Sequence, residues 1–142
     1  MSEVVGLDGV LGVEHVTVTP DEVVVRFTIG EQHLQPFGIP HGGIYCAVHE
    51  STASMAGQVW FGSRGVVVGT NNSTDFLRQA KVGDTITVSA RPIHRGRSQQ
   101  LWRVESVNQD DKLIAQGQVR LANLEQEIPP EVLAKFGGTI PE

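Results

Sequence analysis

The stretch QPFGIPHGGIYCAVHESTASMAG, residues 35–57, contains one acidic residue, Glu50, among small and apolar neighbours. Between Gly43 and Gly57 there is no Lys, Arg, Gln or second Glu to indicate an ordinary solvated helix face. An ionised carboxylate on an apolar surface is costly unless another group compensates it. A carboxylate held in such a place can act as a nucleophile or as a general base. We therefore interpret Glu50 as a catalytic residue rather than a surface glutamate.

A pair of glycines precedes Glu50 at the predicted start of the same helix. The first backbone N–H groups of a helix lack partners and carry partial positive charge. Gly42 and Gly43 have no side chain to block approach, so a developing oxyanion could be stabilised there. His-Gly-Gly alone would indicate only a tight turn. With Glu50 two turns further along, on the face that holds Gly43, the pair favours chemistry on a carbonyl group.

The helix is predicted from Gly43 to about Phe61, because this stretch has helical spacing and no proline. At 100° per residue, Glu50 shares its face only with small residues. The opposite side is bulky and suits packing against a sheet. The small side is Gly43, Cys46, Ala47, Ala53, Ser54 and Gly57, and the bulky side is Ile44, Tyr45, Val48, Thr52, Met55 and Val59. We expect the small side to form a shallow groove, open to a ligand or to another subunit.

Segments with strand patterns lie on both sides of this helix. Residues 22–28 place Val23, Val25 and Phe27 on one face. Four strands are predicted after the helix, separated by hairpin-like turns, and a short helical turn is predicted near Pro130 to Phe136. The four are residues 66–77, 85–91, 101–107 and 112–122, with turns at 82–84, 94–97 and 108–111. One long helix followed by an antiparallel meander is an α+β pattern, in which the helix lies across one face of a curved sheet.

The composition is typical of one globular domain, which we assign to residues 1–142 with a core at about 12–124. The net charge of −5 attracts neither nucleic acid nor an anionic membrane. No apolar run has the length of a membrane span and no signal peptide is evident, so we expect a cytoplasmic protein.

Other kinds of site have weaker support in the sequence. His49-Glu50 begins like the zinc-protease motif H-E-x-x-H, but Ala53 stands where the second histidine is required. The remaining histidines lack ligand spacing, so no metal site is expected. Cys46, the only cysteine, excludes an internal disulfide and is interpreted as a packing residue. The basic stretch RPIHRGRSQQ lacks interleaved aromatic residues, so nucleic-acid binding is not expected.

The motifs together resemble the hotdog-fold acyl-CoA thioesterases, and among them the 4-hydroxybenzoyl-CoA and phenylacetate-pathway (PaaI-like) type. The resemblance covers about Leu34 to Leu124. Its motifs are QPFGIPHGG, a Glu nine residues after His41, a Ser one turn later, the GT at 69–70 and the segment HRGRSQQ. It implies a long helix wrapped by a curved antiparallel sheet, the fold class that the strand and helix patterns also predict.

The resemblance also implies roles for the matching residues. Glu50 would be the catalytic carboxylate, as nucleophile or as base for water, and the Gly42 N–H would polarise the thioester carbonyl. Gln35 and His41 would position the thioester or the attacking water. Ser54, one turn from Glu50, would orient the carboxylate or the water. Phenylacetate-pathway members usually have Asp at the position of Glu50, which places this chain nearer the other branch.

Substrate-binding residues are predicted in two further segments. Arg95, Arg97 and Ser98 are interpreted as contacts to the phosphates of coenzyme A, although loop arginines are often only surface residues. Some aryl-CoA members carry His-His-Arg-Pro where this chain has Phe76, Leu77, Arg78 and Gln79. We expect Phe76 and Arg78 to contact substrate, within a pocket that favours an apolar acyl group over a hydroxylated aryl group.

The expected activity is hydrolysis of an acyl- or aryl-CoA thioester, with coenzyme A as part of the substrate and no other cofactor. The alternatives are a non-catalytic acyl-CoA-binding module, which would not need Gln35, Glu50 and Ser54 together, and a hotdog dehydratase, whose motifs are missing. We also expect a homo-oligomer, as a dimer of dimers with active sites shared across the dimer interface. A monomer whose groove is covered by its own N-terminal segment remains the alternative.

Overall fold

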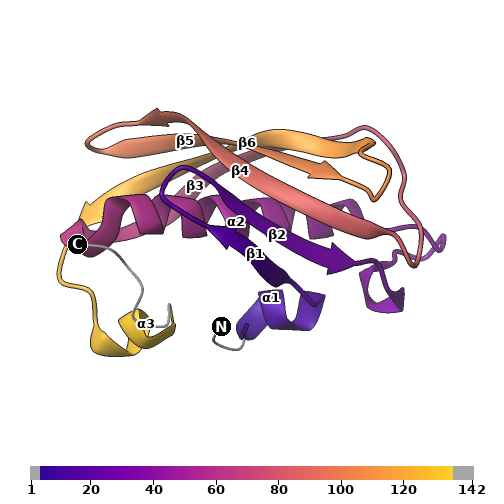
Figure 1. Cartoon of the computed structure of the whole chain (residues 1–142), viewed down its shortest axis with the longest axis horizontal. Helices are drawn as coiled ribbons and strands as arrows, with labels where there is room; N and C mark the ends of the chain where they lie inside the picture. The colour runs from indigo at the N-terminus through magenta and orange to yellow at the C-terminus, as the bar shows by residue number, and fades with distance from the viewer. Residues whose placement is uncertain (1–3, 136–142) are drawn as a thin grey trace.

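A long helix lies across the concave face of a six-stranded antiparallel sheet in the computed structural model, which describes residues 4–135 (Figure 1). The sheet order is β1-β2-β4-β5-β6-β3. The elements are α1 (Gly6–Leu11), β1 (Glu14–Val18), β2 (Val23–Thr28), η1 (Glu31–His33), α2 (Gly42–Phe61), η2 (Gly62–Arg64), β3 (Gly65–Phe76), β4 (Thr85–Arg95), β5 (Gln99–Val107), β6 (Leu113–Glu125) and α3 (Pro130–Lys135). The predicted α+β arrangement is confirmed, with α2 beginning one residue before the expected position.

The core lies between α2 and the inward faces of the strands. In β2 the predicted set Val23, Val25 and Phe27 is buried, because alternate residues of a strand point to the same face. The same alternation buries further apolar residues on the neighbouring strands, and helical spacing buries one side of α2. These are Ile86, Val88 and Ala90 in β4, Trp102 and Val104 in β5, Ala115, Val119 and Leu121 in β6, and Ile44, Val48 and Ala56 in α2.

The predicted small-residue groove on α2 is wrong in its C-terminal half. Ala53 is fully buried, and Gly57 packs so closely that an added Cβ would lie 2.3 Å from Leu121 Cδ1 and 2.7 Å from Gln100 Oε1. The reason is the curvature of the sheet, which wraps the helix. Near Glu50 this face contacts the edge strand β3, and at Gly57, two turns later, it contacts β5 and β6. The groove is therefore open only as far as Ser54, and it is closed at Ala53 and Gly57.

Strand β3 lies at one edge of the sheet and contains a β-bulge. It pairs with β6, and the register shifts between Gly69 and Asn71, so Thr70 is the extra residue. A bulge changes which face the following side chains point to. As a result Gly69 and Asn72, three positions apart, both contact α2, because Gly69 packs against Glu50 and Asn72 Nδ2 donates to the Cys46 carbonyl oxygen over 2.9 Å.

Two short helices lie outside the sheet. The sequence did not indicate α1, which Figure 1 shows below β1. Its C-terminal end is held by the buried His33, whose Nε2–H donates to the Leu11 carbonyl oxygen over 2.8 Å while Nδ1 accepts the Gly30 N–H over 2.9 Å. The other helix, α3, confirms the helical turn expected near Pro130, and Phe136 at the end of that prediction lies outside the described residues.

A histidine in the core gives the fold a pH-sensitive element. The His49 side chain is fully buried, with Nε2 2.6 Å from Ser106 Oγ and Nδ1 without a partner among residues 4–135. Burial disfavours the charged imidazolium and lowers the pKa of His49 from 6.5 to about 4. The ring is therefore neutral in the folded protein at neutral pH, and it belongs to the packing of α2 on β5.

We expect the free energy of unfolding to fall as the pH drops from about 6.5 to about 4. In this window the unfolded chain binds a proton at His49 and the folded chain does not, which costs about 1.4 kcal/mol per pH unit. Urea unfolding measured across this window should show a weaker pH dependence for His49→Gln than for the wild type. Carboxylates affect both proteins equally, so parallel curves would contradict a neutral buried imidazole.

Candidate active site

The loop before α2 is folded back on itself and presents the helix N-terminus. Leu34 and Pro40 form a β-bridge, and the His41 N–H donates to the His33 carbonyl oxygen over 2.8 Å. Within the loop the Gln35 side-chain oxygen accepts the Phe37 N–H. Gln35, which is predicted to position the substrate or water, thus stabilises the turn that leads into α2.

His41 is the N-cap of α2. Its Nδ1 accepts the Gly43 N–H over 2.8 Å, satisfying one of the unpaired donors of the first turn. The Gly42 N–H makes no hydrogen bond within residues 4–135. An added Cβ on Gly42 would lie 3.0–3.2 Å from the Phe76 ring. The first residue of α2 therefore has an unpaired N–H. Because Gly42 has no side chain, the Phe76 ring can lie close to it.

A pocket of about 630 Å³ opens beside this N–H. Its wall is mainly apolar, with polar side chains at Gln35, His41, Tyr45, Arg78 and Gln79. The remaining residues that line it are Pro36, Phe37, Ile39, Pro40, Gly42, Phe76, Leu77 and Ala80. Five residues predicted from separate parts of the sequence, namely Gln35, His41, Gly42, Phe76 and Arg78, thus lie together in one pocket.

Glu50 lies in a different hollow, of about 520 Å³, on the exposed side of α2. Its carboxylate rests on β3, where an added Cβ on Gly69 would lie 3.1 Å from both Cδ and Oε2. Asn72 Nδ2 is 3.5 Å from the other oxygen, Oε1. Ser54, predicted to orient the carboxylate, lines the same hollow, as do Leu7, Cys46, Ala47, Ser51 and Asn72.

The two hollows share no residue, although Tyr45 lines the first and the next residue, Cys46, lines the second. Gly42 and Glu50 are eight positions apart, which corresponds to about 12 Å along a helix axis. A carbonyl group bound to the Gly42 N–H at about 3 Å is therefore beyond reach of Glu50 in the same chain. The sequence analysis predicts that the Glu50 carboxylate and the Gly42 N–H act on the same carbonyl group. Within one protomer these two groups are too far apart to do so.

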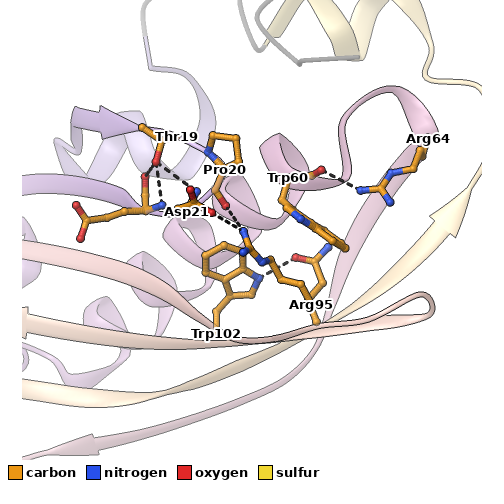
Figure 2. Close-up of polar contacts among 9 residues, drawn as sticks. Thr19, Pro20, Asp21, Trp60, Arg64, Arg95 and Trp102 are labelled. Carbon is orange, nitrogen blue, oxygen red and sulfur yellow. Dashed lines mark hydrogen bonds and ion pairs between the residues drawn. The ribbon is translucent and has the colours of Figure 1, made fainter.

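The predicted phosphate contacts lie at a third place, the turn between β4 and β5. Figure 2 shows Arg95 directed toward the turn between β1 and β2, where its Nη1 donates to the Pro20 carbonyl oxygen over 2.9 Å and to Asp21 Oδ1 over 2.8 Å. Its guanidinium also lies 5.6 Å from the Trp60 ring centroid. Arg95 already has partners within its own chain, and binding a phosphate would require exchange of the Asp21 ion pair.

The two neighbouring residues in that turn, Arg97 and Ser98, have exposed side chains. Their backbone carbonyl oxygens accept hydrogen bonds from the Asn123 side chain and backbone, over 3.2 and 2.9 Å respectively. The turn is thus fixed to β6 while its side chains stay free, and a phosphate-binding role for Arg97 and Ser98 stays a prediction.

Two other kinds of site can be assessed on residues 4–135. No group of three His, Cys, Asp or Glu side chains lies close enough together to hold a metal ion in this part of the chain. None of its helices is both long and apolar enough to cross a membrane.

Residues 37–115 match the family model described as the thioesterase superfamily, which is more than half of the chain. The chain belongs to the thioesterase superfamily. The crystal structure of AziG from S. sahachiroi is similar to this thioesterase with a TM-score of 0.80 and 49% identity, covering 82% of this chain and 94% of that chain. The structure of PaaI from the phenylacetic acid degradation operon of E. coli has a TM-score of 0.78 and 25% identity, with 86% of each chain covered.

A curated relative supplies the same assignment from sequence. The 1,4-dihydroxy-2-naphthoyl-CoA hydrolase of Listeria monocytogenes is 30% identical over 109 residues, which are 77% of this chain and 88% of that protein. The hotdog fold, the PaaI-like type and the thioester hydrolase class expected from the sequence are thereby confirmed for this thioesterase.

Proposed function

We propose that the enzyme hydrolyses an acyl- or aryl-CoA thioester to the free acid and coenzyme A. The observation that carries the proposal is the free N–H of Gly42, a residue that lines a largely apolar pocket of about 630 Å³. Such a pocket accepts an acyl group, and the N–H can donate to the thioester oxygen. The name of the Listeria relative, a hydrolase of an aryl-CoA, supports coenzyme A as the carrier.

In the proposed reaction the Gly42 N–H stabilises the negative charge that develops on the carbonyl oxygen. Glu50 either takes a proton from water, which adds to the carbonyl carbon, or attacks that carbon itself. In the first route the carbon–sulfur bond breaks and the proton passes to the departing thiolate. In the second route coenzyme A leaves first, and water then cleaves the mixed anhydride on Glu50. Both routes yield one carboxylic acid and one thiol.

We propose that each active site is shared between two copies of the chain. About 12 Å of helix separates Gly42 from Glu50 within a protomer, so a partner must bring its own Gly42 to the Glu50 hollow. A twofold axis generates two equivalent sites. The outer edge of β3, unpaired within residues 4–135, and the open hollow beside it are consistent with a partner there.

Assembly into a dimer of dimers follows from the family resemblance. Light scattering with activity over a dilution series tests this, and a fully active monomer would contradict it.

The activity itself is tested with a panel of acyl- and aryl-CoA thioesters and detection of released thiol. Catalytic release of coenzyme A from at least one thioester is expected, while the matched oxygen esters and carrier-bound thioesters define the substrate class. Tight binding of every thioester without release would indicate a binding module instead of an enzyme.

Medium-chain or simple aryl thioesters should be hydrolysed faster than hydroxyaryl thioesters. Phe76 and Leu77 form part of the pocket wall, and an apolar wall leaves a substrate hydroxyl without a hydrogen-bond partner. The measurement is kcat/KM across a panel matched in acyl size. Faster turnover of the hydroxylated member of each pair would contradict this prediction and would mean that a polar side chain of the pocket supplies the partner.

Ser54→Ala should lower kcat more than it raises KM. Ser54 lines the hollow of Glu50 one turn along the helix, where its hydroxyl can orient the carboxylate or the attacking water. Such a contact acts chiefly in the transition state, so its loss reduces the rate of the chemical step. Ser51→Ala, at the neighbouring position of the same hollow, is the control, and a change in KM alone would make Ser54 a substrate-binding residue.

A further inference from the structure

The side chain of Asn72 is held in one orientation beside the Glu50 carboxylate. Thr74 Oγ1 donates to Asn72 Oδ1 over 2.7 Å, which directs the Asn72 amide nitrogen toward α2. There Nδ2 donates to the Cys46 carbonyl oxygen over 2.9 Å and lies 3.5 Å from Glu50 Oε1. An amide has two N–H groups, so it can serve the helix carbonyl and the carboxylate together.

The two oxygens of Glu50 have different surroundings as a consequence. Oε2 lies over Gly69, where an added Cβ would be 3.1 Å away, and Oε1 faces the Asn72 amide. No Lys or Arg forms an ion pair with Glu50 within residues 4–135. An amide donor can therefore fix the direction of the carboxylate without forming an ion pair with it. The carboxylate then keeps its negative charge available to act as a nucleophile or a base.

We propose that Asn72 is a positioning residue for Glu50, with Thr74 setting the orientation of its amide. The proposal rests on the catalytic role of Glu50 proposed above. The 3.5 Å separation is a long contact in the free protein, and we expect it to shorten when substrate occupies the site. Asn72 then acts on the rate of the chemical step and only weakly on substrate affinity.

The test begins with Asn72→Leu, which keeps the branched shape of the side chain at a larger volume and removes the donor. We expect kcat to fall about tenfold with KM nearly unchanged, because a carboxylate that loses its support is misplaced relative to the carbonyl. Asn71→Leu is the matched control, since Asn71 is exposed and precedes Asn72 on the same strand. A fall in thermal stability with unchanged kcat would show that Asn72 only ties β3 to α2, and a rise in KM alone would make it a substrate contact. Either result overturns the proposal.

A double-mutant cycle with Thr74→Val separates orientation from packing. Alone, Thr74→Val should lower kcat a few-fold, because the Asn72 amide is then free to turn its oxygen toward Glu50. In the Asn72→Leu background the same change should have no further effect on kcat. Additive effects of the two changes would contradict an action of Thr74 through Asn72. If Glu50→Ala is fully active, the catalytic role proposed for Glu50 fails, and the role of Asn72 fails with it. If Glu50→Ala is inactive and Asn72→Leu is normal, only the role of Asn72 fails.

Discussion

Glu50→Ala should lower kcat for the best thioester by at least about 100-fold, because it removes the group that attacks the carbonyl or activates water. The fold should be unaffected, since Glu50 is exposed and its side chain rests on the edge strand at Gly69. Binding of a non-hydrolysable thioester analogue should also be retained. Released thiol, measured with purified protein, gives the rate, and thermal unfolding checks the fold.

A control for Glu50→Ala is Glu105→Ala, which removes an exposed carboxylate from β5. It should leave kcat unchanged. Glu50→Gln keeps the shape of the side chain and should be as inactive as Glu50→Ala, since an amide is neither a base nor a nucleophile. Wild-type turnover by Glu50→Ala would exclude the mechanism proposed for this enzyme.

Gly42→Pro should lower kcat by about 100- to 1000-fold, the range found when one donor to an oxyanion is removed. Gly42 is the first residue of α2, a position where proline is tolerated because the N–H has no partner within the helix. The preceding residue, His41, has φ −68° and ψ 128°, which suits a residue before proline. The substitution therefore removes the proposed donor with little cost to the helix.

Gly42→Ala is the matched control for the proline variant. Both add a Cβ near the Phe76 ring, but alanine keeps the N–H. The alanine variant should show a moderate change that reflects a shift of Phe76, a residue that is 56% exposed. Equal losses for the two variants would mean that crowding, and not the missing donor, explains the effect.

The two inactive variants together test the shared site. A purified hybrid dimer of one Glu50→Ala chain and one Gly42→Pro chain has one site with both defects and one site with neither. It should recover about half of the wild-type activity if the two groups of a site come from different chains in a twofold dimer. If both groups came from one chain, every site would be damaged and the hybrid would stay inactive.

The parts of the fold that follow from periodicity were predictable from the sequence. The alternation in residues 22–28 identified the buried face of β2, and a proline-free stretch with helical spacing identified α2 to within one residue. The chemistry-bearing residues of the loop and helix start were also predictable, since Gln35, His41 and Gly42 lie together in one pocket. A local sequence pattern is sufficient to predict a site when the residues that lie together in space are also close together in the sequence.

The features that could not be predicted from the sequence depend on contacts between segments that are distant in the sequence. Ala53 and Gly57 are buried because a curved sheet wraps α2, and helical periodicity holds no information on curvature. The partners of Arg95 come from the turn between β1 and β2, more than 70 positions away in the sequence. Asn72 reaches Glu50 only because of the bulge at Thr70, for which residues 65–76 carry no clear sequence signal.

The helix α1 was missed for a different reason. Its sequence, GLDGVL, contains two glycines, which disfavour helix formation relative to other residues. Packing compensates for this, because Leu11 is buried and its carbonyl oxygen accepts a hydrogen bond from His33. Tertiary contacts override local propensity in such a short segment.

The bulge at Thr70 bears on how enzymes of this kind can change during evolution. Beyond it, one strand carries Asn72 beside the carboxylate and Phe76 beside the acyl pocket. If β3 paired with β6 without the bulge, so that Thr70 lay opposite Arg120, all the following side chains would turn to the opposite face and both places would be damaged at once. Substitutions at Phe76 or Leu77 alter only the acyl pocket. Substrate range can therefore diverge by point mutation, while the pairing of Asn72 to Phe76 with β6 must be inherited unchanged.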